Sequence, residues 1–210
     1  MAVNDQELLS QLRGVRALLL DLDGTLAQTR EPRIRLWREI IREGRVLFHV
    51  ERAMDQLRGR RYSDLDSQLS LIIASKARVP PERVRRVLRE VVDGTWPRCF
   101  RNIRPPTGIS RLLRLADQLQ IPRAVVSDHP AIEKLRAMNL LSGWSAIVGL
   151  RGSGCLKPLP DGIQMALTQL GVSPNQALFV GDRWDTDGAS AARAGVRFLH
   201  VAALGPPNPS

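Results

Sequence analysis

Short apolar runs that end abruptly in polar residues recur along the chain and alternate with segments of helical period. The runs predict five strands, and the segments between them predict helices of about ten residues. The strands are expected at 16–21, 123–127, 145–149, 177–181 and 197–201, and the helices at 5–13, 107–119, 132–138, 161–170 and 187–194. Strands that alternate with helices in this way predict a parallel sheet with both faces covered.

The segment from 30 to 104 interrupts this alternation, because its apolar residues follow only a helical period. Its repeats predict about four amphipathic helices, enough for a small bundle with its own core. Gly44 is expected to end the first helix and Pro81 to open the last one. The predicted apolar faces are Ile34, Trp37 and Ile41; Leu47, Val50, Met54 and Leu57; Leu65, Leu69 and Ile72; and Val84, Val87, Leu88 and Val91.

The first strand ends in two aspartates, Asp21 and Asp23, followed by Gly24 and Thr25. Carboxylates at positions i and i+2 beyond a strand can both reach one point, and like charges that close need a cation or a shared proton. The alternative is an ordinary turn, in which Asp and Gly are common. Ligands bind at the carboxyl edge of a parallel sheet, so the position of the two aspartates favours a binding site over an ordinary turn.

Three later segments carry further polar residues of this kind. Ser127 ends the second strand, Lys157 stands before Pro158, and Asp182 follows the fourth strand, with Asp187 five residues beyond it. Together with Asp21-Leu-Asp23-Gly24-Thr25, these four segments resemble the motifs of the haloacid dehalogenase superfamily of phosphohydrolases. The resemblance covers 16–201, although over 30–104 it is one of architecture only.

The resemblance implies a role for each of these residues. Asp21 is the expected nucleophile and Asp23 the general acid and base; the second aspartate is absent from the dehalogenase branch and argues against carbon–halogen cleavage. Magnesium is the expected cofactor. Its expected ligands are Asp21, Asp182, Asp187 and the carbonyl of Asp23, and the expected substrate contacts are Gly24, Thr25, Ser127 and Lys157.

Four neighbouring residues leave alternatives open. Asp185 is nearer to Asp182 than Asp187 is, but the family spacing favours Asp187, and both suit a helix start. Asp128 stands where the family often has asparagine, and we expect its carboxylate to point away from a phosphate. His129 either lines the site or is incidental, and Trp184 is expected to be a packing residue.

The resemblance also implies the domain organisation, because a cap domain is commonly inserted between the first two strands. The prediction is an α/β core formed by 1–29 and 105–205, a helical cap at 30–104 and a disordered tail at 206–210. The fold class is therefore a doubly wound, parallel, five-stranded Rossmann-like sheet with an inserted α-helical cap.

Composition and charge indicate where the protein is located and what kind of partner it binds. The sequence shows no apolar stretch of membrane-spanning length and no signal peptide, and two distant cysteines form no disulfide framework, so a cytoplasmic location is expected. The net charge is +10, and 30–104 holds 19 basic and 10 acidic residues, a net charge of +9. This asymmetry fits a positive lid over a small anionic phosphorylated metabolite, such as phosphoglycolate or a sugar phosphate. It also suggests that this metabolite carries more than one negative charge.

Two rivals to a phosphatase remain. A phosphomutase uses the same four motifs and would differ in its need for a bisphosphate activator. A catalytically idle, basic binding module for nucleic acid or an acidic protein would also explain the charge, although the complete set of motifs opposes it.

Overall fold

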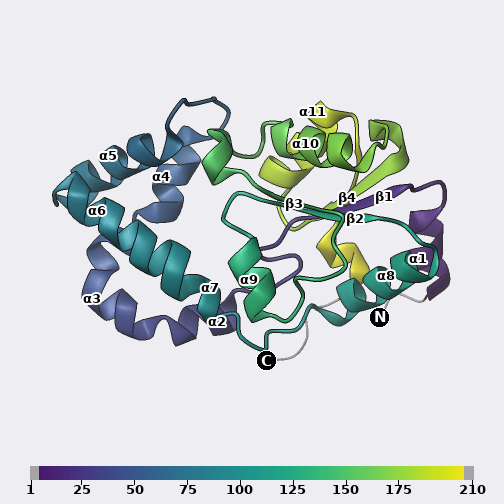
Figure 1. Ribbon diagram of the computed structural model, residues 1–210, viewed down its shortest axis with the longest axis horizontal. Coiled ribbons are helices and arrows are strands. Elements are labelled where there is room, and N and C mark those ends of the chain that lie inside the picture. Colours follow the sequence, from purple (N-terminus) through teal and green to yellow (C-terminus); the bar gives the residue numbers. More distant parts are fainter. Residues whose placement is uncertain (1–4, 206–210) are drawn as a thin grey trace.

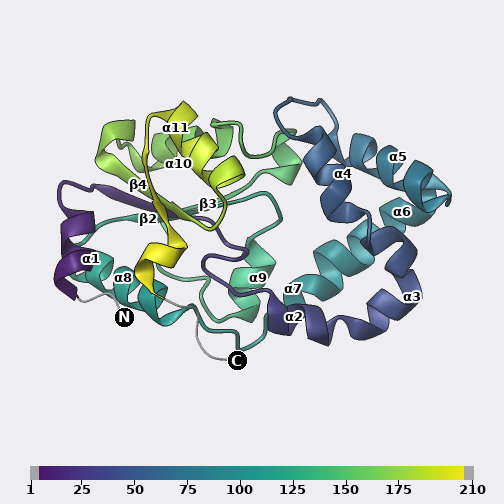
Figure 2. The same cartoon turned by 180° about the vertical axis from the view of Figure 1, so that it is seen from behind.

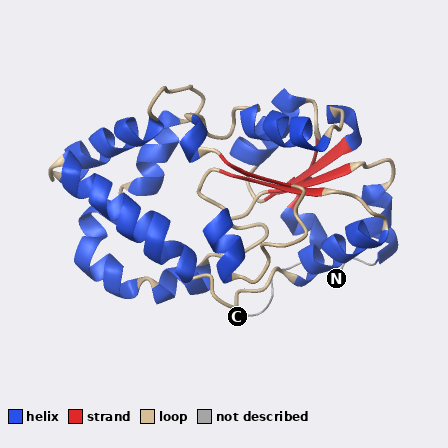
Figure 3. Ribbon diagram, viewed as in Figure 1, coloured by secondary structure: helices blue, strands red, loops and turns tan. Residues whose placement is uncertain are grey.

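Five short apolar strands form one parallel sheet in the larger part of the molecule (Figure 1; strands red in Figure 3). The computed structural model describes residues 5–205. The spatial order is β3-β2-β1-β4-β5, and all neighbouring pairs are parallel. The strands are β1 (Ala17–Leu20), β2 (Arg123–Ser127), β3 (Ala146–Gly149), β4 (Ala177–Gly181) and β5 (Arg197–His200). The predicted α/β, Rossmann-like fold class is confirmed.

Helices cover both faces of the sheet (Figures 1 and 2). On one face lie α1 (Asp5–Leu12), α8 (Thr107–Gln118), α9 (Ile132–Ala137) and a 3₁₀ turn (Val201–Leu204); on the other lie α10 (Asp161–Leu170) and α11 (Ala189–Ala194). Side chains alternate between the faces along a strand. Leu18 and Leu20 of β1 accordingly join one apolar cluster, and Ala17 and Leu19 join the other. Burial on both sides explains why the strands read as continuous apolar runs.

Residues 30–98 form a group of helices beside the sheet, here called the helical insert. It consists of α2 (Arg30–Arg35), α3 (Trp37–Leu47), α4 (Val50–Leu57), α5 (Leu65–Ala77), α6 (Pro81–Val87), a π-helix (Leu88–Thr95) and α7 (Trp96–Arg98). The insert has a separate apolar cluster, and Leu156, which lies outside the insert, also belongs to this cluster. Most of the predicted apolar faces, from Val50 to Val91, supply this cluster.

The first helices of the insert differ from the prediction. Ile34, Trp37 and Ile41 are 64%, 53% and 76% exposed, so the face they share does not enter the core. Helix α3 does not end at Gly44 but bends at Glu43, whose φ is −122°, and continues to Leu47. The bend turns buried Glu43 and Val46 inward, where Glu43 accepts a hydrogen bond from Arg83 at 2.9 Å.

Smaller differences concern the ends of elements. The helix predicted at 187–194 is a π-helix (Trp184–Gly188) followed by α11, and three strands are one or two residues shorter than predicted. Short 3₁₀ helices occur at Arg151–Ser153 and Pro174–Gln176. The tail predicted at 206–210 lies outside the described residues. Among the residues described, no helix has both the length and the apolar character needed to span a bilayer.

Candidate active site

The three central strands bring the candidate residues to one edge of the sheet. β1 lies between β2 and β4, with Leu20 paired to Val125 on one side and to Val180 on the other. Asp21 follows β1 directly, Ser127 ends β2, and Asp182 follows β4. The strand order reverses between β1 and β4, which is where ligands bind in open parallel sheets.

A small cavity of about 70 Å³ opens at this edge. It has room for a group about the size of two water molecules, which each occupy about 30 Å³ in the liquid. Its lining includes six of the predicted residues, Asp21, Asp23, Ser127, Lys157, Asp182 and Asp187, together with Arg58, Asp128, His129, Arg183 and Thr186. Gly24 and Thr25 are not in this lining, so the structure does not place these two predicted substrate contacts in the cavity.

Lys157 is the central cation of the site. Its Nζ donates to Asp21 Oδ1 at 2.5 Å and to Asp187 Oδ1 at 2.6 Å, and the side chain is buried. Burial alone would lower the pKa of Lys157, but the carboxylates of Asp21, Asp187 and Asp128 outweigh burial and raise it. Burial raises the pKa of Asp21, and Asp187 adds to this rise while Lys157 opposes it. The lysine therefore stays charged.

Three carboxylates form a candidate cation site. Asp21, Asp182 and Asp187 each offer an oxygen, and these oxygens lie within 4.8 Å of one another. Burial, and next the charge of Asp187, raise the pKa of Asp182. One lysine cannot neutralise three carboxylates, and an all-oxygen donor set suits a hard divalent cation such as Mg²⁺. The donor set thus fits the expected metal.

Asp185 lies outside this cluster. Its side chain is 68% exposed and accepts a hydrogen bond from Arg183 Nη2 at 2.7 Å. Hydrogen bonding to Arg183 lowers the pKa of Asp185. This geometry assigns Asp185 to the exposed surface of the loop rather than to the carboxylate cluster.

The backbone of the site is closely packed around the carboxylates. Gly24 has a φ of +93°, and a Cβ built there would lie 2.2 Å from Asp182 Oδ2. Asp187 Oδ2 accepts from the backbone N–H groups of Asp182 and Arg183, each at 3.1 Å. The glycine supplies a backbone shape and a close approach that other residues disfavour. Thr25 is fully buried behind this loop.

Asp23 stands at the border of the cavity and has two different oxygens. Oδ2 accepts from Lys134 Nζ at 2.5 Å, and Lys134 is 1% exposed. Oδ1 is buried and has no hydrogen-bond partner among residues 5–205. Sequence reasoning missed Lys134. Its one signal was that lysine occurs at only three positions in an arginine-rich chain.

Arg58 of the helical insert reaches across to the sheet edge. Its Nη1 donates to Asp128 Oδ2 and to the carbonyl of Lys157, both at 2.6 Å. Asp128 Oδ1 accepts from the Lys157 N–H at 2.9 Å, and Lys157 and Arg58 hold the pKa of Asp128 low despite its burial. The expectation that Asp128 points away is wrong, because it lines the cavity with both oxygens engaged. Nothing in the sequence distinguished Arg58 from the other arginines.

The two remaining candidates have different surroundings. His129 lines the cavity, and its Nε2 lies 3.5 Å from Glu51 Oε1 of the insert. A hydrogen bond from His129 lowers the pKa of Glu51 to about 2. Trp184 stacks on His200 at 5.3 Å and meets Phe198 edge-on at 5.0 Å. Trp184 is nevertheless 67% exposed, and its packing role stays a prediction.

Known proteins of similar structure share this architecture. A family model described as haloacid dehalogenase-like hydrolase matches residues 18–201. The structure of L-2-haloacid dehalogenase from Xanthobacter autotrophicus is 20% identical, with a TM-score of 0.60, over 91% of this chain and 79% of that one.

Two further structures carry other activities in their names. β-Phosphoglucomutase from Clostridium difficile is 17% identical (TM-score 0.65; 89% of this chain, 84% of that one). A HAD phosphatase from Thermococcus onnurineus is 18% identical (TM-score 0.58; 88% and 85%). At these identities the structures show the fold alone, whereas the family model covers most of the sequence. The chain belongs to the haloacid dehalogenase-like hydrolase family.

Proposed function

We propose that this protein is a Mg²⁺-dependent phosphatase that hydrolyses a small phosphomonoester through an aspartyl-phosphate on Asp21. One observation carries the proposal: Asp21 is buried in a cavity of about 70 Å³ with a charged lysine and four further carboxylates. Such a site suits a transferring phosphoryl group, which needs a nucleophile, positive charge around its oxygens and a proton donor.

The first chemical step uses Asp21 and Asp23. A carboxylate oxygen of Asp21 attacks phosphorus, the bond from phosphorus to the ester oxygen breaks, and Asp23 gives its proton to the departing alcohol oxygen. Asp23 Oδ1 suits this transfer, because it is buried without a hydrogen-bond partner in the described chain. Lys157 and Ser127, which line the same cavity, would donate hydrogen bonds to the phosphoryl oxygens.

The second step releases phosphate and restores the site. Asp23 takes a proton from a water molecule, the water oxygen attacks phosphorus, and the bond to Asp21 breaks to give inorganic phosphate. Mg²⁺, when bound by Asp21, Asp182, Asp187 and the Asp23 carbonyl, supplies neutralising charge. We further propose that 30–104 acts as a cap on a core formed by 1–29 and 105–205, since Arg58 and Glu51 contact the site from the insert.

The direct test is hydrolysis of para-nitrophenyl phosphate by the purified protein with Mg²⁺ and with EDTA. Turnover that needs Mg²⁺ and is abolished by EDTA is expected. Turnover of a sugar phosphate only in the presence of its bisphosphate would instead indicate a phosphomutase. Release of halide from 2-chloropropionate without phosphate release would contradict the proposal.

Asp182→Ala is expected to weaken Mg²⁺ binding by at least about tenfold, and Asp185→Ala by less than about twofold. Asp182 belongs to the carboxylate cluster, whereas Asp185 is an exposed partner of Arg183. The measurement is the rise in unfolding temperature with Mg²⁺ concentration, because a ligand that binds only the folded state stabilises it. Equal effects of the two substitutions would mean that the acidic residues are assigned wrongly.

Salt is expected to lower kcat/KM for a charged substrate while kcat changes little. The insert carries most of the net positive charge, which attracts anions over a distance of about 8–10 Å at physiological ionic strength. The measurement is kcat/KM between roughly 20 and 300 mM NaCl. A kcat/KM that does not change with salt would show that the charge of the insert does not attract the substrate. Tight binding of duplex DNA with a steep salt dependence would favour a nucleic-acid partner.

A further inference from the structure

A second cavity, of about 1010 Å³, lies within the helical insert and meets the small cavity at Asp23 and His129. Both residues line both cavities. Each also has a buried polar atom, Asp23 Oδ1 and His129 Nδ1, with no hydrogen-bond partner in the described part of the chain. Buried polar atoms are normally bonded, and these two, among six without a hydrogen bond in residues 5–205, share one border, where a bound ligand would satisfy them.

The two cavities differ greatly in size and in lining. The inner one admits little beyond a phosphoryl group, whereas the outer one is at the upper end of the roughly 300–1,000 Å³ typical of small-molecule sites. Most of the outer wall is hydrocarbon and aromatic: Leu36, Ile40, Leu47, Phe48, Val50, Val91, Val92 and Trp96. A hydrocarbon chain would lie against these side chains without leaving a polar group unpaired.

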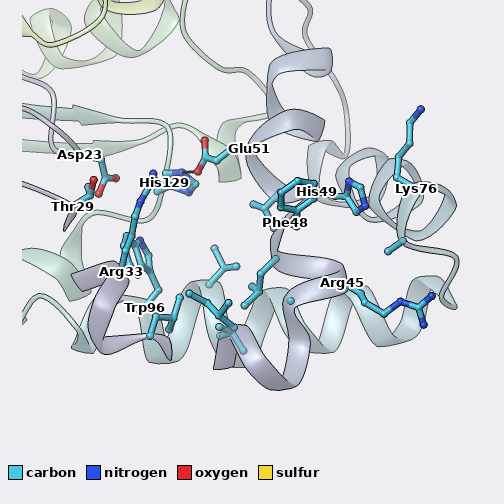
Figure 4. Close-up of a pocket in the computed structure, with 18 of the residues that line it drawn as sticks. Asp23, Thr29, Arg33, Arg45, Phe48, His49, Glu51, Lys76, Trp96 and His129 are labelled. Atoms are coloured by element: carbon cyan, nitrogen blue, oxygen red, sulfur yellow. Dashed lines mark ion pairs between the residues drawn. The ribbon is translucent and has the colours of Figure 1, made fainter. Parts of the chain in front are cut away.

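The polar and charged residues labelled in Figure 4 lie mostly toward the two ends of the outer cavity. Asp23, Thr29, Arg33, Glu51 and His129 gather toward the sheet, and His49, Arg45 and Lys76 lie toward the opposite end. Between the two ends the wall is largely apolar, with Phe48 among its labelled residues. An occupant with its phosphate beside Asp23 would lay the rest of its length against this apolar wall.

We propose that the substrate is an amphiphilic phosphomonoester, in which phosphate esterifies an alcohol with an extended hydrocarbon chain. This proposal rests on the proposed function, and it differs from the small anionic phosphorylated metabolite expected from the sequence. Asp23 would protonate the ester oxygen at the border of the cavities, and the hydrocarbon chain of the alcohol lies in the insert. Burial of each methylene then contributes to kcat/KM.

The first experiment compares ethyl, butyl, hexyl and octyl phosphate, below micelle-forming concentrations. We expect kcat/KM to rise about twofold to fourfold for each added methylene, since fully burying a methylene is worth about 0.8 kcal/mol. Glucose 6-phosphate and phosphoglycolate are expected to be poorer substrates than octyl phosphate. The proposal would be overturned if kcat/KM did not depend on chain length, or if it were highest for glucose 6-phosphate or phosphoglycolate.

Two adjacent isoleucines of α3 provide a matched pair of variants. Ile40 lines the outer cavity and is 46% exposed, whereas Ile41 does not line it and is 76% exposed. Ile40→Glu is expected to lower the octyl-to-ethyl ratio of kcat/KM by at least about tenfold, because a charge then faces the chain. Ile41→Glu is expected to leave the ratio unchanged. Equal ratios in both variants would contradict the assignment of the cavity.

A binding measurement separates this proposal from the proposed function. Octylphosphonate carries the same chain and cannot be hydrolysed at its P–C bond, so its binding needs no turnover. Calorimetry is expected to show binding with a negative heat-capacity change, the signature of apolar burial, weakened in Ile40→Glu but not in Ile41→Glu. This result in a protein that hydrolyses no ester would refute the phosphatase and retain the apolar site. If the protein hydrolyses para-nitrophenyl phosphate but does not bind octylphosphonate, the apolar site is refuted and the phosphatase is retained.

Discussion

Asp21→Asn is expected to lower kcat by at least about a thousandfold while the fold remains intact. The amide has nearly the shape of the carboxylate but is not a nucleophile, so no aspartyl-phosphate forms. The substitution also removes one of the crowded, buried negative charges, and the pKa of Asp21 is already raised by burial. Stability in the absence of metal is therefore expected to be equal or greater. Single-turnover phosphate release and thermal unfolding measure the two effects.

The matched control is Asp185→Asn, which makes the same chemical change at an exposed carboxylate outside the cluster. It is expected to retain at least half of the wild-type kcat. If Asp21→Asn kept more than a few per cent of the activity, a covalent intermediate on this residue would be ruled out. If both variants lost activity together, the loss would not be specific to the proposed nucleophile.

The sheet was predictable from the sequence because burial on both faces makes its strands nearly continuous apolar runs. Leu18, Leu19 and Leu20 are all fully buried, and the run stops where the chain leaves the sheet at Asp21. The same logic placed Ser127 and Asp182 at the edge, since parallel neighbours end together. The family motifs then linked Lys157 to these residues, and it lies within hydrogen-bond distance of Asp21.

The insert was predicted less well, because helical period identifies a face but not what the face contacts. Ile34 and Ile41, predicted to share one helix face, lie in two helices, α2 and α3, and both are exposed. The bend in α3 accompanies a salt bridge between buried Glu43 and partly exposed Arg83, 40 residues apart in the chain. Local pattern carries no information about such a pairing, which depends on tertiary packing.

The same limit explains the residues missed at the site. Arg58 and Lys134 reach Asp128 and Asp23 across 70 and 111 residues of chain, from helical segments whose other charged side chains are mostly exposed. The large cavity was also invisible to sequence reasoning, because its apolar residues read as ordinary core positions. Total charge suggested an anionic partner, whereas the proposal of a hydrocarbon chain on that partner depends on the arrangement of Phe48 and Trp96 in a common wall.

Lys157→Met is expected to destabilise the protein by about 3–5 kcal/mol when metal is removed with EDTA. Methionine fills much of the same volume but leaves Asp21 and Asp187 buried without the ammonium that contacts both. An exposed lysine offers the control: Lys76→Met is expected to change the free energy of unfolding by less than about 0.5 kcal/mol. Urea denaturation in EDTA gives both values.

Two further measurements show whether the loss comes from the crowded carboxylates. Adding Asp187→Asn to Lys157→Met removes one of the uncompensated charges, so the double variant is expected to be more stable than Lys157→Met alone. Mg²⁺ is expected to raise the stability of Lys157→Met more than that of the wild type, since a divalent cation then neutralises charges that no lysine balances. A loss no larger than that of Lys76→Met would show that Lys157 does not hold the cluster together. If neither Asp187→Asn nor Mg²⁺ reduces the loss of stability in Lys157→Met, that loss comes from packing rather than from charge.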